Sequence, residues 1–185
     1  MTASDDLLRR IENEPELAGL LEWPGDFDIA RRDPVEELRL PTGLPLEPIA
    51  GDGAGGTYFL IGEPGGTRPV LFADSEGQAA LMAADLVEAV TIIASFTYWQ
   101  DLGAGHPADE LLADMTDDHP DYPSQRERLL DLLGVTPFTA EEARERLLAS
   151  VSRTVPDFVP LARHEEGGSS YESAYELLLS HTVQA

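Results

Sequence analysis

The middle of the chain alternates short apolar runs with glycine-rich turns, and this pattern restricts the fold more than any other feature. Turn segments at residues 51–56, 63–66 and 74–77 separate runs of four to six mostly apolar residues. A parallel strand pair needs a crossover of a dozen or more residues, and no such length is available here. The pattern therefore predicts an antiparallel meander. Its expected strands are residues 46–50, 57–61, 69–73 and 78–83.

Helical periodicity and capping residues predict helices on both sides of this meander. The expected helices cover residues 4–23 with a restart at Pro15, Asp33 to about Leu40, a segment opening at Asp85, Ser124 to Gly134, Thr139 to about Val151, and Ser169 to Leu179. Glu142 and Arg146 have the i,i+4 spacing of an ion pair. Residues 103–123 and 154–168 are predicted to be loops.

These elements together predict an α+β fold. We expect a meander-like antiparallel sheet of about 4–6 strands, flanking helices and an additional C-terminal helical segment. With 185 residues the chain suggests one domain, 1–185, with its core at about 33–102 and a helical C-terminal extension at about 124–185.

The charge is strongly acidic, because 35 Asp and Glu oppose 12 basic residues to give a net charge of −23. No basic residue other than His lies between Arg68 and Arg126, and eleven Asp and Glu do. Such a chain repels phosphate backbones and anionic lipids, so we expect neither a nucleic-acid nor a membrane partner. It attracts basic proteins, although acidity also serves general solubility.

The absence of cysteine excludes disulfides, thiolate catalysis and cysteine-ligated metals. The N-terminus has neither the basic nor the apolar region of a signal peptide, and no apolar stretch reaches about 20 residues, so we expect a cytoplasmic location. The sequence gives no indication of the oligomeric state.

The motifs do not indicate catalysis or a cofactor. Gly51-x-Gly53-x-x-Gly56 matches the dinucleotide fingerprint in form, but strand residues follow it where the pyrophosphate needs a helix N-terminus. A hairpin turn with positive φ is the preferred interpretation. We therefore predict no enzyme activity and no cofactor.

One metal site remains an alternative within the predicted loop at 103–123. There, His106 and His119 flank several carboxylates, which are potential ligands for a divalent ion. These carboxylates are Asp109, Glu110, Asp114, Asp117 and Asp118. A solvated acidic loop is the preferred interpretation.

The candidate binding residues are acids in turns and loops, together with two aromatic residues. Acids in the hairpin turns and in the acidic loop are expected to contact a basic partner. Aromatic residues that follow a helix and precede the acidic loop are expected to be exposed binding residues. The full set is Asp52, Asp74, Glu76, Tyr98, Trp99, Asp117, Asp118 and Asp121.

The middle block also resembles the SUKH superfamily, which includes many immunity proteins against toxins. The resemblance lies in residues 48–60, an apolar strand, an Asp-Gly-x-Gly turn and an aromatic strand, and continues through 68–77 and 82–90. Residues 40–45 are similar to the Leu-Pro element upstream of that block. The resemblance implies an α+β fold without catalysis that binds a cognate toxin or another protein.

The sequence thus favours a non-enzymatic binding module, immunity-like, that neutralises a basic protein toxin. Two alternatives stay open. One is a housekeeping scaffold or regulatory subunit of the same fold, and the other is a hydrolase that uses carboxylates or a carboxylate–histidine metal site.

Overall fold

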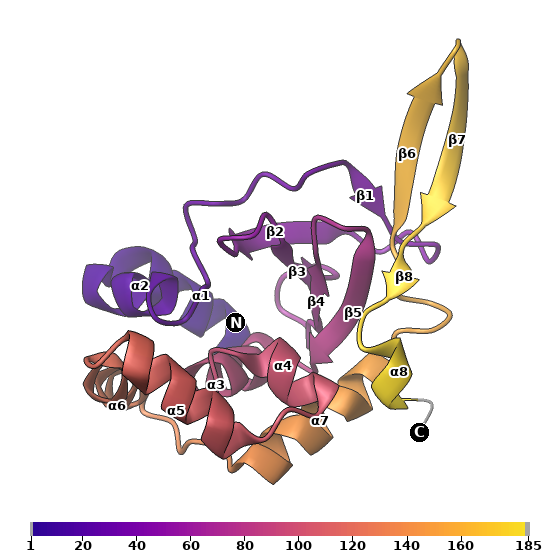
Figure 1. Ribbon diagram of the computed structural model, residues 1–185. Helices are drawn as coiled ribbons and strands as arrows, with labels where there is room; N and C mark the ends of the chain where they lie inside the picture. Colours follow the sequence, from indigo (N-terminus) through magenta and orange to yellow (C-terminus); the bar gives the residue numbers. More distant parts are fainter. Residues whose placement is uncertain (1, 184–185) are drawn as a thin grey trace.

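The computed structural model describes residues 2–183 and has the α+β architecture. A five-stranded sheet lies at the centre, helices cover one side of it, and a long two-stranded arm projects beyond the rest of the molecule (Figure 1).

The predicted meander is confirmed. Its four strands are β2 (Leu46–Gly51), β3 (Thr57–Ile61), β4 (Val70–Ala73) and β5 (Gln78–Ala83). Each pairs antiparallel with the next, in chain order. A short fifth strand, β8 (Glu176–Leu177), joins the edge of β5 in parallel. The C-terminal part of the chain therefore completes the central sheet.

The sheet is buried on both faces, which explains why its strands are continuously apolar rather than alternating. On the helical face, Tyr58 lies between Phe27 and Phe72, and Phe72 meets Trp99 edge-on. On the opposite face, Phe59 packs in a second core cluster that includes residues from the base of the arm. The alternation of side chains along each strand thus supplies two cores.

The helices pack on the face of the sheet that carries Tyr58 and Phe72 (Figure 1). They are α1 (Ala3–Asn13), α2 (Pro15–Glu22), α3 (Leu86–Ser95), α4 (Trp99–Ala104), α5 (Ala108–Asp118), α6 (Tyr122–Leu133), α7 (Ala140–Ser152) and α8 (Ser180–Val183). Several predicted boundaries are confirmed. Asp85 caps α3 by accepting from the Glu88 N–H, and Gly134 ends α6 in the left-handed conformation.

The capping box at Thr139 is also confirmed, and it determines where Glu142 points. The Glu142 carboxylate accepts the Thr139 N–H, which keeps the pKa of this carboxyl below its usual range. The predicted ion pair between Glu142 and Arg146 does not form. Arg146 instead binds Glu88 of α3 at 2.9 Å, and so connects α7 to α3.

Three predictions along the chain are wrong. No helix opens at Asp33, because Glu36 accepts the Tyr175 hydroxyl at 2.7 Å instead of capping a helix, and the chain runs into strand β1 (Leu38–Arg39). The predicted loop at 103–123 contains α5 and the start of α6. Ser124 is not a cap, since α6 begins at Tyr122 and the Ser124 hydroxyl donates to the Asp121 carbonyl.

The predicted helix from Ser169 to Leu179 is wrong as well. This segment forms β7 (Ser169–Ala174), which pairs antiparallel with β6 (Leu161–Glu166), and then β8. The Gly167-Gly168 turn between β6 and β7 has positive φ at both residues, as a two-residue hairpin requires. Within residues 124–183 the chain is therefore helical only in α6, α7 and α8, and β6 lies within the predicted 154–168 loop.

Candidate functional site

Helix α5 is the least buried helix of its length in the described chain. None of its eleven residues is buried, and only a few, including Leu111 and Met115, are half-buried. These two side chains are four apart and share one side of the helix. The helix contacts α4 and α6, the two helices on either side of it in the chain. Helix α5 therefore packs against the rest of the protein through one narrow side, and its other sides are exposed to solvent.

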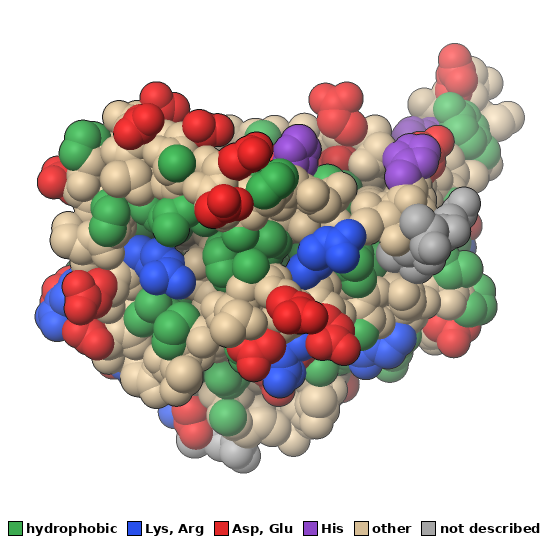
Figure 2. Space-filling model, turned by 60° about the horizontal axis from the view of Figure 1, so that its bottom comes forward, with side chains coloured by type: hydrophobic (Ala, Val, Ile, Leu, Met, Phe, Trp, Pro, Cys, Tyr) green, Lys and Arg blue, Asp and Glu red, His purple; other side chains and the backbone are tan. Residues whose placement is uncertain are grey.

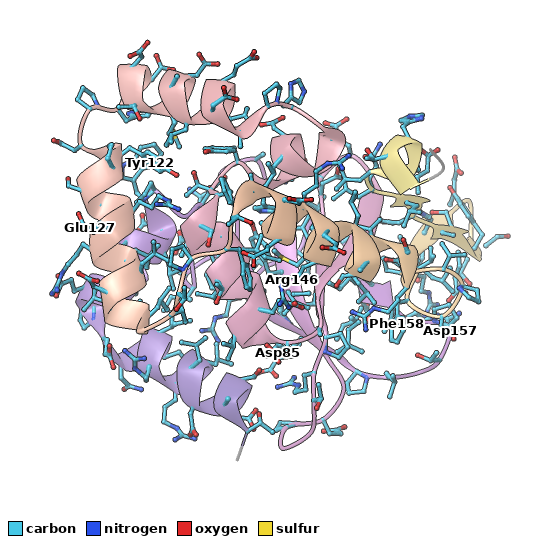
Figure 3. The ribbon with its side chains drawn as sticks, turned by 90° about the horizontal axis from the view of Figure 1, so that it is seen from below. Asp85, Tyr122, Glu127, Arg146, Asp157 and Phe158 are labelled. Carbon is cyan, nitrogen blue, oxygen red and sulfur yellow. The ribbon has the colours of Figure 1, made fainter. Side chains whose placement is uncertain are left out.

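Seven carboxylates lie on α5 and its two flanking segments. All are exposed, and in the part of the chain that the structure describes none of them forms an ion pair. We call this surface the α5 face. Its acids are Asp101, Asp109, Glu110, Asp114, Asp117, Asp118 and Asp121. Acidic side chains gather along the upper left of Figure 2, and carboxylates on α5 project outward at the top of Figure 3.

Several of these acids lie where they oppose the stability of their own helix. Asp117 and Asp118 occupy the last turn of α5, where the partial negative charge of the helix dipole disfavours an anion. Asp114 lies three and four residues before them, a spacing that brings like charges together. The positions of Asp114, Asp117 and Asp118 are therefore not explained by the folding of α5.

Trp23 adds an aromatic surface near the C-terminal end of α5. It lies directly after α2 and is 44% exposed, although Trp is usually well buried. Its ring contacts the edge of His119, the C-cap of α5, with ring centroids 4.6 Å apart. An exposed Trp ring near carboxylates is suited to Lys or Arg, because the carboxylates pair with the cation and the ring attracts it by cation–π interaction.

The predicted binding acids divide into exposed and structural residues. Asp117, Asp118 and Asp121 are exposed on the α5 face, and Glu76 is exposed in the β4–β5 turn. Asp52, by contrast, is only 6% exposed.

The Asp52 carboxylate accepts the N–H groups of Ala54 and Gly56 at 3.0 and 2.6 Å, so it holds the β2–β3 turn. Asp74 acts similarly in the β4–β5 turn, where it accepts from Glu76 and Gln78. The structure therefore gives both acids a role within their own turns.

The two predicted aromatic contacts also differ from each other. Trp99 is 3% exposed, packs on Phe72 and donates its indole N–H to the Tyr58 hydroxyl at 3.3 Å. Tyr98 is half-buried, and this burial raises the pKa of its phenol to about 12. Trp99 is thus a core residue, and its position in sequence, after a helix and before acids, gave no sign of this.

Sequence reasoning missed Trp23 as a surface residue, and it read α5 as a loop. The signal for α5 was present, since Leu111 and Met115 have helical spacing and Asp109 and Glu110 are favourable in a first turn. The predicted helix over residues 4–23 ends at Trp23, and the exposure of this residue depends on tertiary contacts.

The glycine motif at 51–56 has a packing role. A side chain at Gly56 would approach the Phe72 ring to 2.5 Å, and a side chain at Gly51 would meet the Arg31 carbonyl at 2.8 Å. Gly55 has the positive φ expected of a hairpin turn. The motif leads into β3 rather than into a helix.

A cavity of about 460 Å³ lies between α1 and the segment after β3. Its charged groups have partners within the fold. Arg68, itself buried, pairs with Glu47, and Glu12 pairs with Arg32. Asp5 completes the capping box of α1 with Thr2 and accepts the Gly65 N–H at 3.2 Å. Among residues 2–183, no group of three or more His, Asp or Glu side chains is arranged to hold a metal ion.

Comparison with known protein families, with curated proteins and with solved structures found no match to this chain. Within the described residues, no helix combines the length and the apolar character needed to cross a membrane.

Proposed function

We propose that this protein is a non-enzymatic binding module that recognises a basic protein through the α5 face, and that it acts as an immunity-like protein that neutralises a basic toxin. The observation that carries the proposal is the α5 face itself. Seven exposed carboxylates, none in an ion pair with another described residue, lie on and around a helix without a buried residue, next to a half-exposed Trp23.

The arginines of the protein support this choice of surface. Nine of them form ion pairs with acids on other parts of the chain, for example Arg128 with Glu16 on α2 and Arg32 with Glu12 on α1. The negative field of those regions is thereby partly neutralised. No ion pair of this kind forms on the α5 face among the described residues, so a basic partner is steered there and associates faster.

The α5 face also has the composition of a charged interface with an anchor. Carboxylates around an aromatic residue supply orientation and rate, while Trp is among the residues that most often dominate binding energy. Removing Trp23 would then affect dissociation, and removing carboxylates would affect association.

The class of partner is inferred from two observations. A net charge of −23 suits a basic protein, and toxins that hold nucleic acid are basic. The resemblance of residues 48–90 to an immunity superfamily favours a toxin over a housekeeping partner. A scaffold or regulatory subunit would use the same face for a harmless basic protein.

The experiment compares two variants of equal charge. The α5 variant neutralises four acids of the face, with the changes Asp114→Asn, Asp117→Asn, Asp118→Asn and Asp121→Asn. The matched control variant neutralises four exposed acids elsewhere that form no ion pair among the described residues, with the changes Asp33→Asn, Glu37→Gln, Glu63→Gln and Asp157→Asn. Figure 3 shows Asp157 on the side of the molecule away from α5.

Tagged wild-type protein and both variants are used to capture proteins from lysate of the native organism at low and high salt. We expect a basic protein that the wild type and the control retain at low salt and that the α5 variant loses. Equal retention by all three proteins, or capture of no basic protein, would refute the proposal. Expression of the captured protein alone and with this chain then separates a toxin from a harmless partner, since only a toxin stops growth unless it is neutralised.

A further inference from the structure

The arm formed by β6 and β7 extends beyond the body of the protein, and its β7 edge is open (Figure 1). Strand β1 covers only the base of β6, where Leu38 pairs with Ala162. All six residues of β7 are exposed. An isolated two-stranded hairpin is marginally stable in water, and an open edge presents unpaired N–H and C=O groups to other strands.

The register of the arm identifies which groups point outward. Tyr175 donates its N–H to the Pro160 carbonyl at the base of the arm, and pairing alternates along the ladder. The backbone N–H and C=O groups of the odd-numbered residues of β7 therefore point toward β6. Those of Ser170, Glu172 and Ala174 point away from it. Farther along on that same side, Glu176 and Leu178 donate their N–H groups to Gly77 and Ala79. The edge that β5 occupies thus continues, without a partner strand, along the arm.

The two edges of the arm differ in their charges. The exposed end of β6 carries Arg163, Glu165 and Glu166, and charges of this kind discourage pairing with another strand. Strand β7 has a single charge, Glu172, which forms an ion pair with Arg39 of β1. Its remaining residues are Ser, Tyr and Ala.

We propose that β7 pairs antiparallel with β7 of a second copy of this chain, forming a two-fold symmetric dimer with a continuous sheet across both arms. A strand of this protein is the partner that the edge fits best. Each copy has a net charge of −23 and repels the other, so the copies approach most easily where acids are few and already paired.

Charge and aromatic packing favour a register with the two-fold axis at Tyr171. If Tyr171 lies opposite Tyr171 of the second copy, the backbone N–H and C=O of Ser170 can pair with those of Glu172 of the second copy. Two-fold symmetry then gives the same pair a second time, with the two copies exchanged. Moving the axis by one residue to Glu172 would set like charges opposite each other, which is unfavourable. Tyr171 is 50% exposed and stacks on His164 with ring centroids 5.0 Å apart, so the chosen register also joins two aromatic pairs.

A cysteine placed at the axis tests this register directly, because the chain has no cysteine of its own. Residues opposite each other in a non-hydrogen-bonded antiparallel pair have Cα atoms about 4.5 Å apart, within the range of a disulfide. Under mild oxidation, Tyr171→Cys should form covalent dimers quickly. Ser169→Cys should not, because Ser173 of the second copy lies opposite it. Equal and slow crosslinking of both variants would overturn the register.

A second measurement keeps the dimer itself testable without removing Tyr171. Ser170→Pro removes an N–H that the monomer does not use, and proline is tolerated on such an edge. Ser170→Ala is the matched control. Because symmetry removes two hydrogen bonds at once, Ser170→Pro should weaken the dimer about 30-fold in sedimentation equilibrium. The control should associate like the wild type.

The salt dependence of dimerisation is a third test of the proposal. Because the two copies repel each other, added salt should strengthen this dimer. A wild-type protein that remains monomeric at low and high salt, at the highest concentration that sedimentation reaches, would overturn the proposal.

Discussion

Helix α5 and strand β7 are both elements without a buried residue, yet their charges are arranged in opposite ways. The α5 face has seven carboxylates and no ion pair among the described residues, whereas the one charge of β7 is paired with Arg39. A surface of the first kind repels its own copy and attracts cations. A surface of the second kind tolerates a copy of itself.

The comparison shows that exposure alone does not indicate what a surface binds. In our two proposals the pairing of the charges distinguishes the surfaces, so salt should act on them in opposite directions. Screening should weaken the binding of a basic partner to the α5 face and strengthen pairing of the arms.

The two tryptophans test whether the α5 face lies outside the folding core. Trp99→Ala should lower the free energy of unfolding by about 3–5 kcal/mol, because it leaves a cavity beside Phe72 and Tyr58. Trp23→Ala should lower it by less than about 1 kcal/mol. Urea unfolding monitored by circular dichroism measures both. Similar large losses in the two variants would mean that Trp23 supports the fold and is not a free binding surface.

Substitution of Asp52 tests whether this acid stabilises its turn, in contrast to the exposed acids of the α5 face. Asp52→Ala should reduce the free energy of unfolding by about 1–3 kcal/mol, because the N–H groups of Ala54 and Gly56 lose their acceptor. Glu76→Ala in the neighbouring turn is the exposed control and should change stability by less than about 0.5 kcal/mol. Thermal unfolding of the two variants, compared with the wild type, is sufficient. An unchanged stability in Asp52→Ala would return this acid to the candidate binding residues.

The acids at the end of α5 should make their helix less stable than it would be without them. Asp117→Asn and Asp118→Asn should each stabilise α5 by about 0.3–1 kcal/mol, because the helix dipole no longer opposes a charge. Amide hydrogen exchange in residues 108–118 reports this as slower exchange. Faster exchange in the variants would show that these carboxylates support the helix, and the argument for selection by a partner would lose its basis.

The smallest effect concerns the paired charge of the arm. The Arg39 guanidinium keeps the pKa of the Glu172 carboxyl below its usual range. The ion pair therefore contributes stability above the unfolded pKa of about 4.3 and loses it as the pH falls through the lower folded value. In Arg39→Ala the pKa of Glu172 should rise toward its ordinary value. An NMR titration of the glutamate side chains checks this, and an unchanged pKa would show that Glu172 is unpaired in solution.

The meander was predictable because its signals are local. Apolar runs and turn residues lie next to each other in sequence, and Gly55 and Gly77 have the positive φ that such turns require. The arm was not predictable in the same way. Ser169-Ser170-Tyr171-Glu172 has the spacing of a capping box, and its pairing with β6 follows from the two glycines before it rather than from its own composition.

The candidate site was only partly predictable for a similar reason. Composition identifies the acidic segment, and the structure leaves its acids Asp117, Asp118 and Asp121 exposed. Sequence position does not show which way a turn acid points, and Asp52 turns inward to Gly56. Nor does it distinguish Trp99, which the sheet buries, from Trp23, which remains exposed beside His119.

The central claim, recognition of a basic partner by the α5 face, is tested most directly by association kinetics with the purified partner across a range of ionic strengths. For the wild type and the matched control variant, the association rate should be fast at low salt and fall steeply as salt is added. For the α5 variant it should be about tenfold slower at low salt, depend less on salt, and converge with the others at high salt. Indistinguishable rates for the α5 variant and the control would contradict the account.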